Sequence, residues 1–123
     1  MNINLLVIRT ENPELLKNQY EKLGFEFDYH KHGKGPYHYA SEKNGFVFEI
    51  YPLTKSMIKA DGNLRLGFDI SDLSSIIDRL KDTDWIIKSD IRETEWGIIA
   101  IIQDLDGRKI ELKNKQKTPY NNG

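Results

Sequence analysis

The chain contains no cysteine among its 123 residues, which excludes disulfide bridges, thiolate metal sites and a cysteine nucleophile. It also lacks any apolar run near the roughly 20 residues that a membrane-spanning helix requires, and it lacks the basic and apolar start of a secretory signal. The charge has no dominant sign, since 18 basic and 19 acidic residues give a net charge of −1. Nucleic-acid and membrane partners are therefore not expected, and we expect a cytoplasmic protein.

What the chain does contain is an internal repeat. Residues 42–50 (EKNGFVFEI) and 104–112 (DLDGRKIEL) each have an acidic turn closed by glycine and a glutamate four residues beyond that glycine. These glutamates are Glu49 and Glu111. The sequence therefore predicts two copies of one module, with the two glutamates facing a shared cavity.

In the first module, hydrophobic periodicity predicts the element order βαβββ. Asn12 is a suitable N-cap and Pro13 fits the first position of a helix. The Asn44-Gly45 pair predicts a turn between two strands. The expected elements are a strand over 3–10, a helix over 12–24, and strands over 25–30, 37–41 and 46–51.

The second module repeats this order at an offset of 60 residues, since Asp72 matches Asn12 as a helix start. The expected elements are strands over 64–70, 85–89, 98–103 and 108–113, a helix that begins at 72, and a loop over 94–97. We expect a single α+β domain over 1–123, with modules at 1–51 and 63–113, a linker over 52–62 and a flexible tail over 114–123. About 60 residues are too few for reliable independent stability, so the modules should pack together, within one chain or in a homodimer.

Strand alternation assigns side chains to the two faces of each predicted sheet. Phe46, Phe48 and Ile50 should face the helix, so Glu49 and Tyr51 should face away from it. In the second module, Ile110 and Leu112 face the helix and Glu111 faces away from it. Alternation alone does not decide whether this non-helix face meets solvent or a cavity.

The repeat resembles the vicinal oxygen chelate superfamily, which includes glyoxalase I, extradiol dioxygenases and fosfomycin- and bleomycin-resistance proteins. The resemblance is carried by the βαβββ order, by residues 66–73 (LGFDISDL) before the second helix, and by residues 104–112 at the end. It covers nearly the whole chain, and Leu105 stands where the family pattern commonly has proline. The resemblance implies two βαβββ modules whose mixed sheet curves around a cleft, with the helices outside.

Enzymes of this superfamily hold a divalent metal with a His or Gln on the first strand and a Glu on the last strand of each module. The resemblance places Glu49 and Glu111 at the last-strand positions, but Leu5 and Arg65 at the first-strand positions. Leu5 has no lone pair, and the permanent charge of Arg65 would repel a metal ion. We expect no cofactor and no usual metal centre, with Arg65 pairing a glutamate or binding an anionic group of a ligand.

Three histidines keep a metal alternative open. His30 and His32 are two residues apart, a spacing that two metal ligands could use but that is more typical of two solvated side chains at a strand end. A two-residue turn at Asn44-Gly45 places His38 beside Glu49, whereas a three-residue loop places it on the other face. The alternative metal set is therefore His38, Glu49 and Glu111, holding zinc, nickel, manganese or iron.

Tyr51 and Trp96 are candidate aromatic walls for a planar ligand, although Trp96 could instead pack in a core or hinge. The ligand-binding candidates are Glu49, Glu111, Arg65, Tyr51, His38 and Trp96. Two functions follow from the resemblance. The chain is expected to bind a small molecule in the inter-module cleft, as bleomycin-resistance proteins do. The alternative is a metal-dependent lyase, isomerase or dioxygenase.

Overall fold

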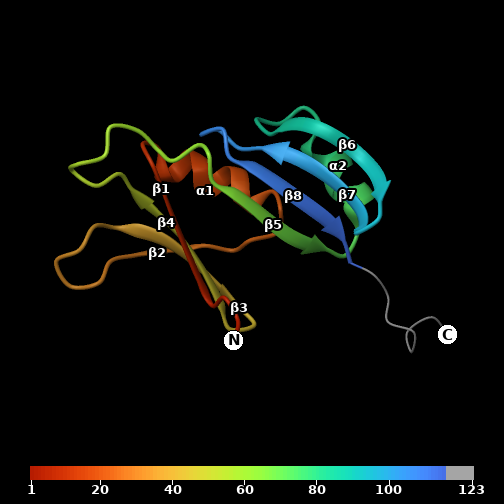
Figure 1. The fold of residues 1–123 in the computed structure, drawn as a ribbon. Coiled ribbons are helices and arrows are strands. Elements are labelled where there is room, and N and C mark those ends of the chain that lie inside the picture. The colour runs from red at the N-terminus through yellow and green to blue at the C-terminus, as the bar shows by residue number, and fades with distance from the viewer. Residues whose placement is uncertain (116–123) are drawn as a thin grey trace. The chain divides into compact units, whose positions relative to one another are not determined.

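A computed structural model describes residues 1–115 of the chain (Figure 1). The chain divides into two compact units, one over Met1–Gly62 and one that begins at Asn63. This boundary falls at the end of the predicted linker over 52–62. We call these units the first and second modules. Among the described residues, no helix is both long enough and apolar enough to span a bilayer.

The first module contains one helix and four strands in the predicted order βαβββ. Strand β1 pairs in parallel with β4, and β4 and β2 pair antiparallel with β3, so the sheet order is β1-β4-β3-β2. The elements are β1 (Leu5–Thr10), α1 (Pro13–Glu21), β2 (Asp28–His30), β3 (His38–Lys43) and β4 (Phe46–Pro52).

The second module has the same topology, with the sheet order β5-β8-β7-β6. Its elements are β5 (Arg65–Ile70), α2 (Leu73–Leu80), β6 (Ile86–Thr94), β7 (Gly97–Gln103) and β8 (Lys109–Asn114). The strand register confirms the repeat, because Val7 lies opposite Glu49 in the first module and Gly67 lies opposite Glu111 in the second. The two glutamates therefore hold the same place in their sheets.

The core of the first module combines a cluster of aromatic rings with the buried aliphatic side chains of Ile8, Leu16, Leu23 and Ile50. Phe48 of β4 is fully buried, and its ring contacts those of Tyr20, Phe25 and Phe27 at centroid distances of 5.1, 5.1 and 5.8 Å. Tyr20 comes from α1, so this cluster holds the helix against the sheet. The prediction that Phe46, Phe48 and Ile50 face the helix is consistent with the complete burial of Phe48 and Ile50.

The core of the second module is aliphatic apart from Trp85, which is 4% exposed. Asp72 caps α2 by accepting a hydrogen bond from the backbone N–H of Ser75. The side chains buried between α2 and the sheet belong to Leu73, Ile76, Ile77, Leu80, Ala100, Ile102, Ile110 and Leu112. This agrees with the helical periodicity and with the strand alternation read from the sequence.

Several predicted boundaries need correction, and most of them shift by one to three residues. Phe25 and Phe27 lie outside β2, because their rings turn into the core around Phe48 rather than following a strand. Strand β6 continues past Ser89 to Thr94, and two register shifts accommodate the extra residues. Asn114 belongs to β8 rather than to a tail, because its side-chain oxygen accepts a hydrogen bond from the backbone N–H of Leu73. The remaining predicted tail, 116–123, lies outside the described residues.

Candidate functional site

The non-helix face of the first module collects a histidine and a glutamate on neighbouring strands. Ala40 of β3 lies opposite Glu49 of β4, and Asn44 and Gly45 form the two-residue connection, with φ angles of 54° and 80°. This is the first of the two registers considered from the sequence. It places His38 diagonally beside Glu49, and the His38 Nε2 atom lies 3.2 Å from Glu49 Oε2.

His38 is held from both sides of its ring. The side chain is 1% exposed, and Nδ1 lies 3.2 Å from the backbone carbonyl oxygen of Pro36. Since a carbonyl can only accept, this contact is a hydrogen bond when the ring carries a proton on Nδ1. In the neutral form with that proton, Nε2 keeps its lone pair, which lies beside the Glu49 carboxylate and 3.4 Å from the Tyr51 hydroxyl oxygen.

Tyr51 and Arg9 extend this polar group along the same face. The Tyr51 ring stacks on His38 at a centroid distance of 4.1 Å, and the Arg9 guanidinium lies 4.8 Å from the centre of the Tyr51 ring. Burial and the nearby charge of Glu49 raise the pKa of the Tyr51 phenol, and Arg9 lowers it in part. Tyr51 is therefore a neutral hydrogen-bond donor at physiological pH.

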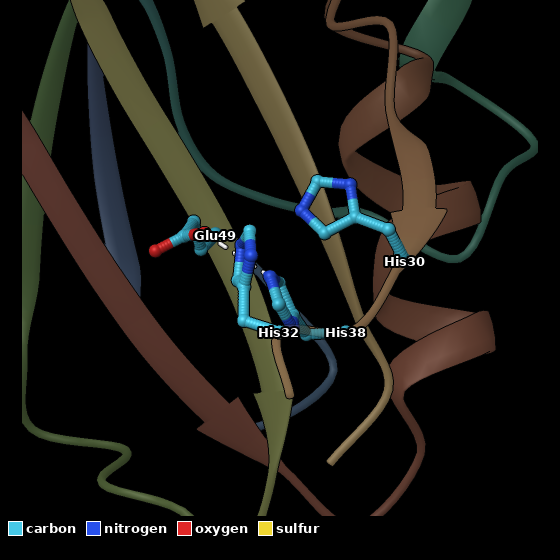
Figure 2. A group of neighbouring side chains, drawn as sticks. All are labelled: His30, His32, His38 and Glu49. Atoms are coloured by element: carbon cyan, nitrogen blue, oxygen red, sulfur yellow. Dashed lines mark ion pairs between the residues drawn. The ribbon is translucent and has the colours of Figure 1, made fainter. Parts of the chain in front are cut away.

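Two further histidines, His30 and His32, lie close to His38 and Glu49. His30 of β2 lies directly opposite His38 of β3, and His32 follows two residues later. Figure 2 shows the three imidazoles and the Glu49 carboxylate gathered in one group. One potential ligand atom from each of the four residues lies within 4.8 Å of the others. We call His30, His32, His38 and Glu49 the histidine cluster.

The loop between β2 and β3 turns back immediately after His32. Gly33 has a φ of 56°, which glycine adopts easily, and the backbone N–H of Gly35 donates to the carbonyl of His32 at 2.9 Å. A Cβ added at Gly35 would lie 3.1 Å from that same carbonyl oxygen. The two glycines therefore allow the tight turn that keeps His32 near His38.

In the second module, Glu111 and Arg65 share the non-helix face. Gly67 of β5 lies opposite Glu111, and Arg65 lies two residues before Gly67 on the same side, with an exposed side chain. On the other flank of Glu111, strand β7 presents Ile101 and Ile99. The pairing of Arg65 with either glutamate stays a prediction.

Trp96 does not join Glu111 or Arg65 within the second module. It lies in the turn between β6 and β7 and is 71% exposed, so the core alternative is wrong for its side chain. Ile101, the residue opposite Glu111, is five residues further along the chain, a separation of about 16 Å along an extended strand. Trp96 is thus a surface residue at the end of a hairpin.

The sequence reasoning did not select Arg9, His30 or His32 as site residues. Arg9 could have been found, because strand alternation from Leu5 places it on the same face as Tyr51 of the neighbouring strand. His30 and His32 could not be assigned, because their role depends on the pairing of β2 with β3. At the remaining first-strand position, the side chain of Leu5 is 51% exposed.

No known protein-family model matches the chain, and no curated protein matches it in sequence. Solved structures do match. The fold that they share is that of the glyoxalase/bleomycin-resistance proteins, also called the vicinal oxygen chelate fold. It is the fold that the resemblance of the sequence to this superfamily implies.

One neighbour is TnmS3, an antibiotic-binding protein from a Streptomyces species, with 21% identity, a TM-score of 0.74 and coverage of 94% of this chain and 97% of TnmS3. A glyoxalase/bleomycin-resistance protein from the same genus has 22% identity and a TM-score of 0.70, over 92% of this chain and all of that one. A bleomycin-binding protein complexed with bleomycin has 15% identity and a TM-score of 0.62, over 94% and 99%. At these identities the likeness establishes the fold.

Proposed function

We propose that this chain binds a small molecule through the non-helix faces of its two modules, in the cleft that the fold would form between them. The observation that carries this proposal is the row of Arg9, Tyr51, His38 and Glu49 on the face that α1 leaves uncovered. A cation, two stacked rings and a carboxylate in succession are suited to orient a planar, polar ligand. Antibiotic-binding neighbours of the same fold support this reading.

In this proposal the second module contributes Glu111 and Arg65, with Trp96 as a candidate aromatic wall. The exposed guanidinium of Arg65 would bind an anionic group of the ligand. The usual metal centre of the superfamily would be absent, because Leu5 offers no ligand atom and Arg65 is a permanent cation. A homodimer, with or without exchange of modules, is part of the proposal and follows from the fold alone.

A second candidate function is metal-dependent catalysis of the kind found in the superfamily, as a lyase, isomerase or dioxygenase. The approach of His38 Nε2 to Glu49 Oε2 favours it, because this pair is able to bind a divalent ion such as zinc, nickel, manganese or iron. A set of His38, Glu49 and Glu111 would draw on both modules.

The test is a thermal-shift screen of the metal-free chain, purified in the presence of a chelator. The compounds are bleomycin and a panel of aromatic and anionic small molecules. A ligand at a hundred times its Kd should stabilise the protein by about 2.7 kcal/mol, and Tyr51→Ala should weaken that ligand at least tenfold. Lys34→Ala, in the β2–β3 loop, is the matched control. If no compound shifts the metal-free protein but one is converted when metal is added, the catalytic alternative replaces the proposal.

A further inference from the structure

We propose that the histidine cluster is a zinc-type metal site contained entirely within the first module, with His30, His32, His38 and Glu49 as its four ligands. This site shares Glu49 with the first-strand and last-strand ligand pattern of the superfamily, but its three histidines lie outside that pattern, which needs residues of both modules. It does not rest on the small-molecule function proposed above. The argument comes from the donor set, the spacing of the donors and the hydrogen bond that orients His38.

The donor set suits a borderline divalent metal. Three imidazoles and one carboxylate are common zinc ligands, and imidazole also suits copper and nickel. Calcium and magnesium are disfavoured, because they take oxygen ligands and this group offers oxygen from Glu49 alone.

One pair of donors already has the spacing of two ligands on one ion. Zinc–nitrogen and zinc–oxygen bonds of about 2.0–2.2 Å at the tetrahedral angle place two ligand atoms about 3.4 Å apart. His38 Nε2 and Glu49 Oε2 lie 3.2 Å apart. The widest separation in the cluster is up to 4.8 Å, so binding would draw at least one side chain inward. His32, which is exposed and lies two residues beyond the end of β2, has the freedom to make this movement.

The imidazole ring of His38 is oriented like that of a metal ligand, because the nitrogen that would not bind the metal already contacts a backbone carbonyl. A histidine that binds metal through one ring nitrogen usually donates the other N–H to a carboxylate or a backbone carbonyl. His38 Nδ1 lies 3.2 Å from the Pro36 carbonyl oxygen, to which the ring donates when its proton is on Nδ1, and Nε2 lies 3.2 Å from Glu49 Oε2. In that tautomer Nε2 and the carboxylate oxygen both carry lone pairs, and a cation or a proton between them is needed to make their contact attractive.

With four protein ligands, the site would have no open position for substrate, which is characteristic of structural zinc sites. Binding would tie the β2–β3 loop, which carries His32, to strands β3 and β4. We therefore expect the metal to stabilise the first module and to order residues 31–37, rather than to catalyse a reaction.

The experiment uses the complete chain without a polyhistidine tag, because a tag would itself bind zinc. Zinc is titrated into the metal-free protein in competition with a chromophoric chelator, and circular dichroism confirms the fold of each variant before titration. We expect one tight zinc per chain and an affinity loss of at least a hundredfold in His38→Ala. His30→Asn and His32→Asn should each lose at least tenfold, and these partly exposed positions serve if His38→Ala does not fold.

Glu49→Gln and Glu111→Gln form the matched pair that decides between the ligand sets. The proposal predicts that Glu49→Gln weakens zinc and that Glu111→Gln leaves it within a factor of two. Loss of zinc in Glu111→Gln would overturn the proposal in favour of a site shared by both modules. Weak binding with no defined stoichiometry, or tight binding that His30→Asn and His32→Asn leave unchanged, would also overturn it. Because the small-molecule screen uses metal-free protein, failure of either experiment leaves the other interpretable.

Discussion

The two modules place a glutamate at the same point of the same topology, yet its neighbours differ completely. Beside Glu49, the adjacent antiparallel strand presents His38, two residues before the residue opposite the glutamate. At the matching place beside Glu111, that strand presents Ile99. The fold therefore fixes where the carboxylate lies, and the adjacent strand determines what the carboxylate can bind. The repetition of the glutamate in both modules therefore does not mean that both modules contain the same binding site.

The modules differ also in the composition of their cores, because a cluster of aromatic rings surrounds Phe48 in the first module. Removal of this central ring should have the largest effect on stability. Phe48 lies opposite Leu6, and Ile110 lies opposite Leu66, so the two fully buried residues are equivalent. Phe48→Ala should cost about 3–5 kcal/mol of unfolding free energy, because it removes the ring on which three other rings pack. Ile110→Ala should cost less, toward the lower end of about 2–5 kcal/mol.

Urea unfolding of both variants, followed by circular dichroism, measures these losses. Phe48→Leu is the control that keeps most of the apolar volume, and it should recover more than half of the loss. A larger loss in Ile110→Ala than in Phe48→Ala would show that the aromatic cluster is not the stronger of the two cores.

The loops before the two glutamates are held differently, and this gives a second prediction. In the second module, the buried Arg108 side chain donates to Asp104 at 3.2 Å and to Asp106 at 2.8 Å. Burial alone lowers the pKa of Arg108, but the two carboxylates more than offset this, so the pKa is raised. Arg108→Met should therefore cost about 3 kcal/mol, because Asp104 is left buried without its cation.

The raised pKa means that the contribution of Arg108 is fully present below the ordinary pKa of arginine and is lost only above it. The stability difference between wild type and Arg108→Met, measured by urea unfolding, should therefore not fall as the pH rises from about 7 to 9. Lys43→Met, at an exposed position in the turn region of the first module, should change stability by less than about 0.5 kcal/mol. Adding Asp104→Asn to Arg108→Met should restore stability, and a further loss would contradict this account.

The helix starts provide the smallest expected effect. Asp72 accepts hydrogen bonds from the hydroxyl and the backbone N–H of Ser75, and these bonds lower the pKa of its carboxyl. Asn12, the equivalent residue of α1, makes no capping hydrogen bond with its side chain. Asp72→Ala should therefore lower Tm slightly near neutral pH, whereas Asn12→Ala should lower it less.

A lowered folded-state pKa stabilises above the unfolded value, about 3.9, and this contribution disappears as the pH falls through the folded value. The thermal unfolding of wild type and Asp72→Ala should therefore differ at about pH 6, and the difference should shrink as the pH falls below about 3.9. A difference that stays constant over this range would mean that the charge of Asp72 has no part in capping α2.

The fold could be predicted from the sequence because its signals are local. The glycine-closed turns, the alternation around Phe48 and the periodicity of α2 each depend on neighbouring residues, and all three are confirmed. The boundaries of β2 and β6 were wrong, because the burial of Phe25 and Phe27 and the register shifts of β6 depend on distant partners. The histidine cluster also depends on residues that are distant in the sequence. His30 meets His38 only through the pairing of β2 with β3, and no residue in the 31–37 loop specifies that register.

The central claim is that only the first module surrounds its glutamate with histidines that can bind a metal. The most direct test is X-ray absorption at the zinc edge, measured on the complete chain loaded with one equivalent of zinc. If the metal lies in the histidine cluster, the spectrum should show three imidazole nitrogens and one carboxylate oxygen at about 2.0–2.2 Å. A shell of oxygen atoms with one imidazole or none would contradict the account, because it would place the metal away from the three histidines of the first module.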